Sequence, residues 1–69
     1  MFLTPDHLVR ELKLKPGDRV ADLGAGTGAY TIALAREVGE MGQVFAVDVH
    51  REQLHTLAGT LERQNLMNV

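Results

Sequence analysis

Two carboxylates and a run of alternating glycines are the residues whose types and spacing could do chemistry. Glycines stand at every second position of 24–28, directly after an apolar run that ends at Leu23. Glycine permits close approach of a ligand to the backbone, and the N-terminus of a following helix carries partial positive charge. Asp48 lies about 20 residues beyond the loop, where a carboxylate can accept hydrogen bonds from both ribose hydroxyls. The pattern indicates a site for a nucleoside-bearing ligand.

The glycine spacing alone does not identify that ligand. Gly24, Gly26 and Ala29 also satisfy the relaxed dinucleotide fingerprint, which permits alanine at its third position. Asp22 separates the two ligands, because a carboxylate beside the loop would repel a pyrophosphate but attract an ammonium or a sulfonium. S-adenosylmethionine (SAM) carries both cations and no phosphate. The pattern therefore favours SAM, and an NAD-binding oxidoreductase fragment stays open as an alternative.

The segment Lys15–Gly28 resembles the first motif of the class I SAM-dependent methyltransferases. That motif has the form acid-x-Gly-x-Gly-x-Gly and follows a Pro-Gly-Asp turn, which here is Pro16-Gly17-Asp18. The resemblance runs from about Thr4 to Val69. It implies that the chain is the N-terminal, SAM-binding portion of a catalytic domain.

The resemblance also implies roles for particular residues. The loop would pass under the methionine part of SAM, Asp22 would hold its amino group directly or through water, Asp48 would bind the ribose, and Val49 would lie against the adenine. The residues that hold the methyl acceptor in this family fall beyond Val69, so we expect methyl transfer from a longer parent and not from this chain alone. Catalytic residues and the acceptor stay unassigned. The implied contacts with SAM or its product S-adenosylhomocysteine (SAH) are Asp22, Gly24, Ala25, Gly26, Thr27, Gly28, Asp48 and Val49.

Several of these residues have a plainer interpretation. Asp22 could stabilise the glycine loop through backbone amides, and Asp48 could cap the helix that follows it. Tyr30 could reach the methionine carboxylate, although packing in the first helical turn is favoured. His50 and His55 lack the i, i+4 spacing of a helical metal face, so no metal site is expected. His50 is expected to be solvated, near the edge of the adenosine site.

The site must be positioned by strands and helices that alternate along the chain. Short apolar runs at 19–23 and 43–48 predict strands, the first of them buried, and helical periodicity predicts helices over 29–38 and 51–65. Alternation of this kind implies an α/β fold with a parallel sheet. We expect one partial Rossmann-like domain over 1–69. It consists of an N-terminal helix within 1–15 and a β-α-β-α unit over 19–69, with a possible third strand starting at Asn68.

Apolar side chains at helical spacing predict which faces pack. In the first helix, Thr4 is expected to cap the N-terminus and Leu3 to form a hydrophobic staple with Leu8. Gly39 is expected to end the second helix. The predicted buried faces are Leu8, Val9 and Leu12 in the first helix, Tyr30, Ala33, Leu34 and Val38 in the second, and Leu54, Leu57, Ala58 and Leu61 in the third.

Composition narrows the class of protein. The 69 residues are 45% hydrophobic and 23% charged, as in an ordinary globular domain. Seven basic and nine acidic residues give a net charge of −2, and the absence of a basic cluster argues against nucleic acid binding by this segment. There is no cysteine, no apolar run long enough to span a membrane and no signal-peptide pattern. A cytoplasmic protein with no membrane partner is the expectation.

A sheet of two or three strands leaves an edge unpaired, and exposed edges recruit other strands. We therefore expect a two-fold homodimer in which the strand at 19–23 meets its own copy antiparallel. A self-associating half-domain without enzymatic activity is thus a third interpretation of the chain.

Overall fold

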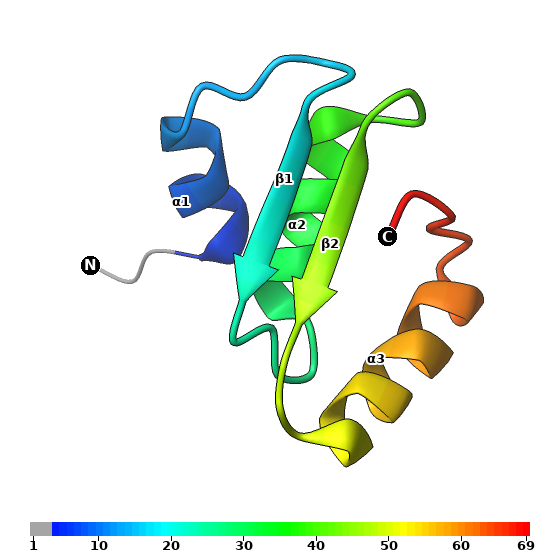
Figure 1. The fold of residues 1–69 in the computed structure, drawn as a ribbon. Helices are drawn as coiled ribbons and strands as arrows, with labels where there is room; N and C mark the ends of the chain where they lie inside the picture. Colours follow the sequence, from blue (N-terminus) through cyan, green and yellow to red (C-terminus); the bar gives the residue numbers. More distant parts are fainter. Residues whose placement is uncertain (1–3) are drawn as a thin grey trace.

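The computed structural model describes residues 4–69, in which helices and strands alternate in the predicted order (Figure 1). The α/β class is confirmed, and both strand starts lie where turn residues predict them. The elements are α1 (Pro5–Glu11), β1 (Arg19–Leu23), α2 (Ala29–Val38), β2 (Gln43–Val47) and α3 (Arg51–Arg63).

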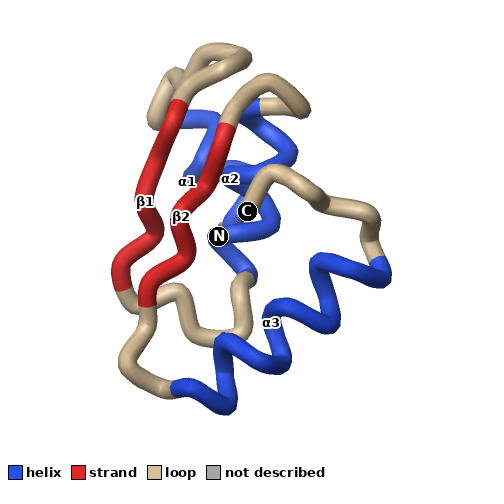
Figure 2. The backbone as a smooth tube through the Cα atoms, turned by 45° about the vertical axis from the view of Figure 1, so that its right-hand side comes forward, coloured by secondary structure: helices blue, strands red, loops and turns tan. Residues whose placement is uncertain are grey.

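β1 and β2 form a parallel sheet, in register from Arg19 opposite Gln43 to Leu23 opposite Val47. Both strands point the same way, and the connecting helix α2 lies behind them (Figure 1). The three helices lie on one side of the strand pair (Figure 2). Within residues 4–69, the sheet therefore has one covered face and one open face.

The open face corrects one prediction. β1 was expected to be a buried strand, yet its burial alternates along the chain and Leu23 is 78% exposed. On β2, Phe45 and Val47 are 42% and 49% exposed on that same face. The prediction was wrong because an apolar run shows that a strand can be buried on two faces, but not whether two layers of helices are present.

The core lies between the covered sheet face and the helices α1 and α2. Val44 and Val38 are fully buried in one cluster, so the start of β2 packs against the end of α2. Leu12 and Tyr30, predicted to share buried faces, are 60% and 44% exposed, so those two predictions were wrong. The buried cluster is Val9, Ala33, Leu34, Ala35, Val38 and Val44, with Leu14, Val20, Leu66 and Val69 packed against it.

The ends of α1 and α2 follow local chemistry. The Thr4 side chain accepts a hydrogen bond from the His7 backbone N–H at 3.2 Å, which confirms the predicted cap. α1 ends at Glu11, earlier than the segment 1–15 suggested, and Lys13 then takes a positive φ of 58°. Gly39 ends α2 as predicted, with φ of 72°. The predicted staple involves Leu3, which lies outside the described residues.

The apolar face of α3 is less buried than its sequence predicted. Only Leu57 of its apolar face is buried, whereas Leu54 and Leu61 are half-buried and Ala58 is exposed. The helix also ends at Arg63, before the predicted Asn65. The partly covered leucines line an apolar groove of about 380 Å³ between α3 and β2.

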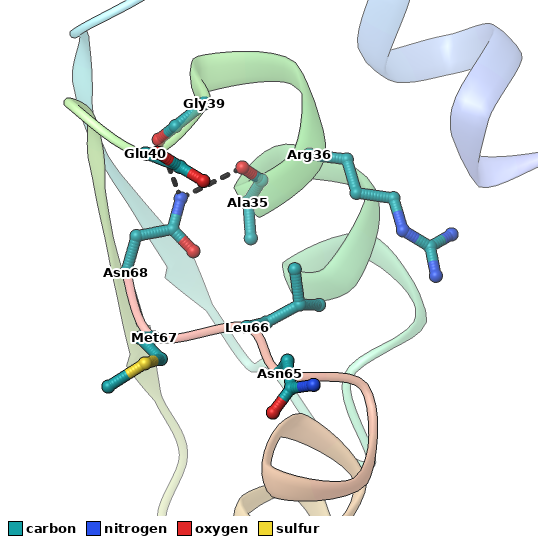
Figure 3. A pocket seen from close by; sticks show the side chains of 8 residues that line it. All are labelled: Ala35, Arg36, Gly39, Glu40, Asn65, Leu66, Met67 and Asn68. Carbon is teal, nitrogen blue, oxygen red and sulfur yellow. Dashed lines mark hydrogen bonds between the residues drawn. The ribbon is translucent and has the colours of Figure 1, made fainter.

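The last residues return from α3 along the outer edge of β2. The Asn68 side-chain amide donates to the carbonyls of Ala35 and Gly39 at 2.8 and 2.9 Å and so caps the end of α2 (Figure 3). The Asn68 carbonyl accepts from the Val44 N–H at 2.8 Å. No third strand forms over 68–69 in the described chain, but this bond lies where one would begin.

Candidate functional site

The glycine loop 24–28 crosses from the carboxyl end of β1 to the start of α2. The N–H groups of Gly24 and Ala25 donate to the Val47 carbonyl at 2.7 and 3.0 Å, which ties the loop to the end of β2. Gly24, Gly26 and Gly28 all have positive φ, at 78°, 58° and 99°. Residues with a Cβ rarely adopt this conformation, so the backbone itself requires glycine at these positions.

The last glycine of the loop also makes room for α3. A Cβ on Gly28 would overlap the Cδ1 atom of Leu57, and one on Gly26 would lie 3.1 Å from the Gln53 Oε1 atom. Leu57 is 2% exposed, so it packs directly on the glycine loop. The first turns of α3 therefore form one wall of the loop, a contact that the sequence did not reveal.

Asp48 joins the glycine loop to the start of α3. Its Oδ2 accepts from the Gly26 N–H at 2.7 Å, and its Oδ1 accepts from the His50 N–H at 2.7 Å. The His50 ring Nδ1 lies 2.8 Å from Oδ1. The Asp48 side chain is 7% exposed, whereas that of His50 is 68% exposed. The alternative in which Asp48 is the N-cap of the following helix was wrong, because the N-cap of α3 is His50.

These contacts stabilise the ionised form of Asp48. The backbone N–H of His50, the backbone N–H of Gly26 and the His50 ring hold the pKa of Asp48 below its ordinary value of 3.8. Asp48 is therefore ionised at neutral pH. An ionised carboxylate is a pure acceptor, which suits a pair of ribose hydroxyls.

Asp22 is the second-last residue of β1 and lies opposite Ala46, two residues before Asp48. Its Oδ2 accepts from the Thr31 hydroxyl at 2.7 Å, and Thr31 is fully buried in the first turn of α2. The alternative in which Asp22 binds loop amides was wrong, because Thr31 is its hydrogen-bond donor in the described chain. Thr31 was not predicted to belong to the site. The sequence feature that could have indicated it is a hydroxyl residue in the first turn of the helix that follows the loop.

The structure thus brings the predicted site residues to one end of the sheet. Asp22 and Asp48 lie at the carboxyl ends of neighbouring parallel strands, where ligands of open α/β sheets bind. Val49, next to Asp48, is 93% exposed, and Thr27 at the tip of the loop is also exposed. Ala25 is 9% exposed and serves the packing of the loop. The role of each residue as a SAM contact stays a prediction.

One hollow of the described residues lies away from this site. It measures about 450 Å³ and borders the carboxyl-terminal half of α2, away from the glycine loop that precedes this helix (Figure 3). The candidate site is instead an open surface at the strand ends. Within residues 4–69, no three His, Asp or Glu side chains gather as a metal site, and no helix is long and apolar enough to cross a membrane.

A parallel βαβ unit with a glycine loop after β1 and a carboxylate after β2 defines a partial Rossmann-like, nucleoside-binding domain. Residues 14–69 match the family described as "Methyltransferase domain". The chain therefore belongs to the class I SAM-dependent methyltransferases.

Relatives from different organisms share this segment. The chain is 35% identical over 63 residues to the tRNA (adenine(58)-N(1))-methyltransferase catalytic subunit of Yarrowia lipolytica, covering 91% of this chain and 16% of that protein. A SAM-dependent methyltransferase from Aquifex aeolicus is 37% identical with a TM-score of 0.85, covering 94% of this chain and 35% of the other. Coclaurine N-methyltransferase bound to N-methylheliamine and SAH is 31% identical with a TM-score of 0.84, covering 94% and 19%. The chain thus spans well under half the length of each.

Proposed function

We propose that this chain binds SAM and SAH at the carboxyl ends of β1 and β2, as the cofactor-binding portion of a methyltransferase. The observation that carries the proposal is the pair of carboxylates, Asp22 and Asp48, beside a loop in which three glycines have positive φ. The open apolar surface of Val49 beside Asp48 suits an adenine ring. Support comes also from coclaurine N-methyltransferase, which carries SAH in its solved structure.

The residues present fit each part of the ligand. A carboxylate offers about four acceptor positions, and the backbone N–H groups of Gly26 and His50 use two of those on Asp48. The exposed His50 ring can turn away and free the others for the two ribose hydroxyls. Asp22 keeps one oxygen for the amino group of the methionine part, since Thr31 binds only Oδ2.

We propose that methyl transfer itself belongs to a longer protein. Bound SAM supplies an electrophilic methyl group, and holding it in line with an acceptor provides much of the rate enhancement. The residues of this chain bind and orient the cofactor. Two of the relatives described above are named after their methyl acceptors, a tRNA adenine and coclaurine. These acceptors differ in chemistry although both enzymes share this segment, so the acceptor is recognised by other residues.

Calorimetric titration tests the binding proposal. We expect saturable, one-to-one binding of SAH and none of NAD under the same conditions, because Asp22 repels a pyrophosphate at the loop. Circular dichroism and a thermal melt establish that the titrated sample is folded. Tighter binding of NAD than of SAH, or a folded sample that takes up no SAH, would refute the proposal.

We further propose that the isolated chain forms a dimer through the edge of β1. Backbone groups alternate along a strand, and those of Val20, Asp22 and Gly24 face β2 in this register. The N–H groups of Ala21 and Leu23 consequently face the unpaired edge. A second copy related by a two-fold axis would pair with them antiparallel.

Light scattering tests this assembly. The unmodified chain is expected to show twice the monomer mass of 7.6 kDa, and Ala21→Pro, which removes one edge N–H, is expected to be a monomer. Ala21→Val keeps the N–H and should remain a dimer. A monomeric unmodified chain at high concentration would contradict the proposal.

A further inference from the structure

Thr31 is the one fully buried polar residue in the part of the chain that the structure describes. A buried hydroxyl needs a hydrogen-bond partner, because leaving it unpaired is costly. The usual partner of a helical threonine is the carbonyl one turn back. Thr56 and Thr60 in α3 follow that rule and donate to the carbonyls of Glu52 and Thr56 at 3.2 Å.

Thr31 departs from this rule. Its hydroxyl donates to the Asp22 carboxylate, which belongs to β1, and the distance of 2.7 Å is that of a charge-assisted bond. The bond joins the start of α2 to the end of the strand before the glycine loop. It fixes the orientation of the carboxylate and engages only one of its oxygens, so that in residues 4–69 the Oδ1 atom has no hydrogen-bond partner.

We propose that Thr31 is a positioning residue that aims the free oxygen of Asp22 at an α-ammonium group of the ligand. This inference rests on the proposed function and deepens it. By holding Asp22, Thr31 sets the preference of the site for a nucleoside that carries an amino acid over the same nucleoside without one. Thr31 itself touches no ligand.

Binding of two ligands distinguishes a positioning role of Thr31 from a general contribution to the stability of the fold. SAH has the α-ammonium, whereas 5′-methylthioadenosine shares the adenosine and the sulfur but lacks the amino-acid part. In Thr31→Val, which replaces the hydroxyl by a methyl group, we expect SAH affinity to fall about tenfold and methylthioadenosine affinity to stay within about twofold. Thr31→Ser keeps the hydroxyl and should keep SAH affinity within about threefold of the unmodified chain.

A second variant keeps the test decisive if Thr31→Val folds poorly. Thr31→Ala also removes the hydroxyl but leaves no methyl group against the Asp22 carboxylate, and it should reduce the ratio of SAH to methylthioadenosine affinity in the same direction. Asp22→Asn should do the same, and adding Thr31→Ala to it should change that ratio no further. Equal weakening of both ligands in Thr31→Val, or no change in either, would overturn the positioning role while leaving the binding site intact. An unmodified, folded chain that binds neither ligand would instead refute the proposed function, and this inference with it.

Discussion

Asp48→Ala is expected to lower SAH affinity by at least about 100-fold, because each ribose hydroxyl loses a charged acceptor. The loss should be larger than for any other single carboxylate in the chain. The same carboxylate also holds the Gly26 and His50 N–H groups, so its removal loosens the loop that the ligand crosses. Titration with SAH measures the affinity, and faster amide exchange at Gly26 reports the loosened loop.

Two matched variants define the origin of this effect. Glu40→Ala removes a carboxylate from the exposed turn before β2 and should leave SAH affinity unchanged. His50→Ala removes only the ring, because the His50 backbone N–H still reaches Asp48, and should change the affinity much less than Asp48→Ala. Unchanged SAH binding in Asp48→Ala would show that the ribose lies elsewhere.

The sequence predicted those parts of the structure that depend on local chemistry. Thr4 and Gly39 mark helix ends, and Pro16-Gly17-Asp18 marks the entry to β1, because capping and turns involve residues close in the chain. The two carboxylates followed from topology, since the carboxyl ends of neighbouring parallel strands must meet at one edge of the sheet. The position of both carboxylates at that edge could therefore be predicted, but their hydrogen-bond partners could not.

The parts that were missed depend on residues far apart in the chain. Periodicity placed Leu57 on the apolar face of α3, but not its contact with Gly28. Periodicity likewise placed Tyr30 on the same buried face as Ala33, but Tyr30 is exposed. The sequence of a helix does not show how far the neighbouring element extends to cover its apolar face. No role was predicted for Thr31, because nothing local shows that its hydroxyl reaches across to β1.

Gly28→Ala is expected to destabilise the chain by about 2–5 kcal/mol, the sum of backbone strain and overlap with a buried side chain. Gly28 has φ of 99°, and its added Cβ would collide with Leu57, which is 2% exposed. Domains are stable by only about 5–15 kcal/mol, so this change removes a large share of the total. Urea denaturation measures the change in the free energy of unfolding.

Gly24→Ala separates the two contributions to that loss. Gly24 has φ of 78°, but no atom lies within 4 Å of the position of its Cβ, so this variant should show backbone strain alone, about 1–2 kcal/mol. If the excess in Gly28→Ala comes from Leu57, then Gly28→Ala combined with Leu57→Ala should be more stable than the sum of the two single changes predicts. Equal destabilisation by Gly24→Ala and Gly28→Ala would mean that α3 does not rest on the glycine loop, and the wall that Leu57 and Gln53 form beside the candidate site would be absent in solution.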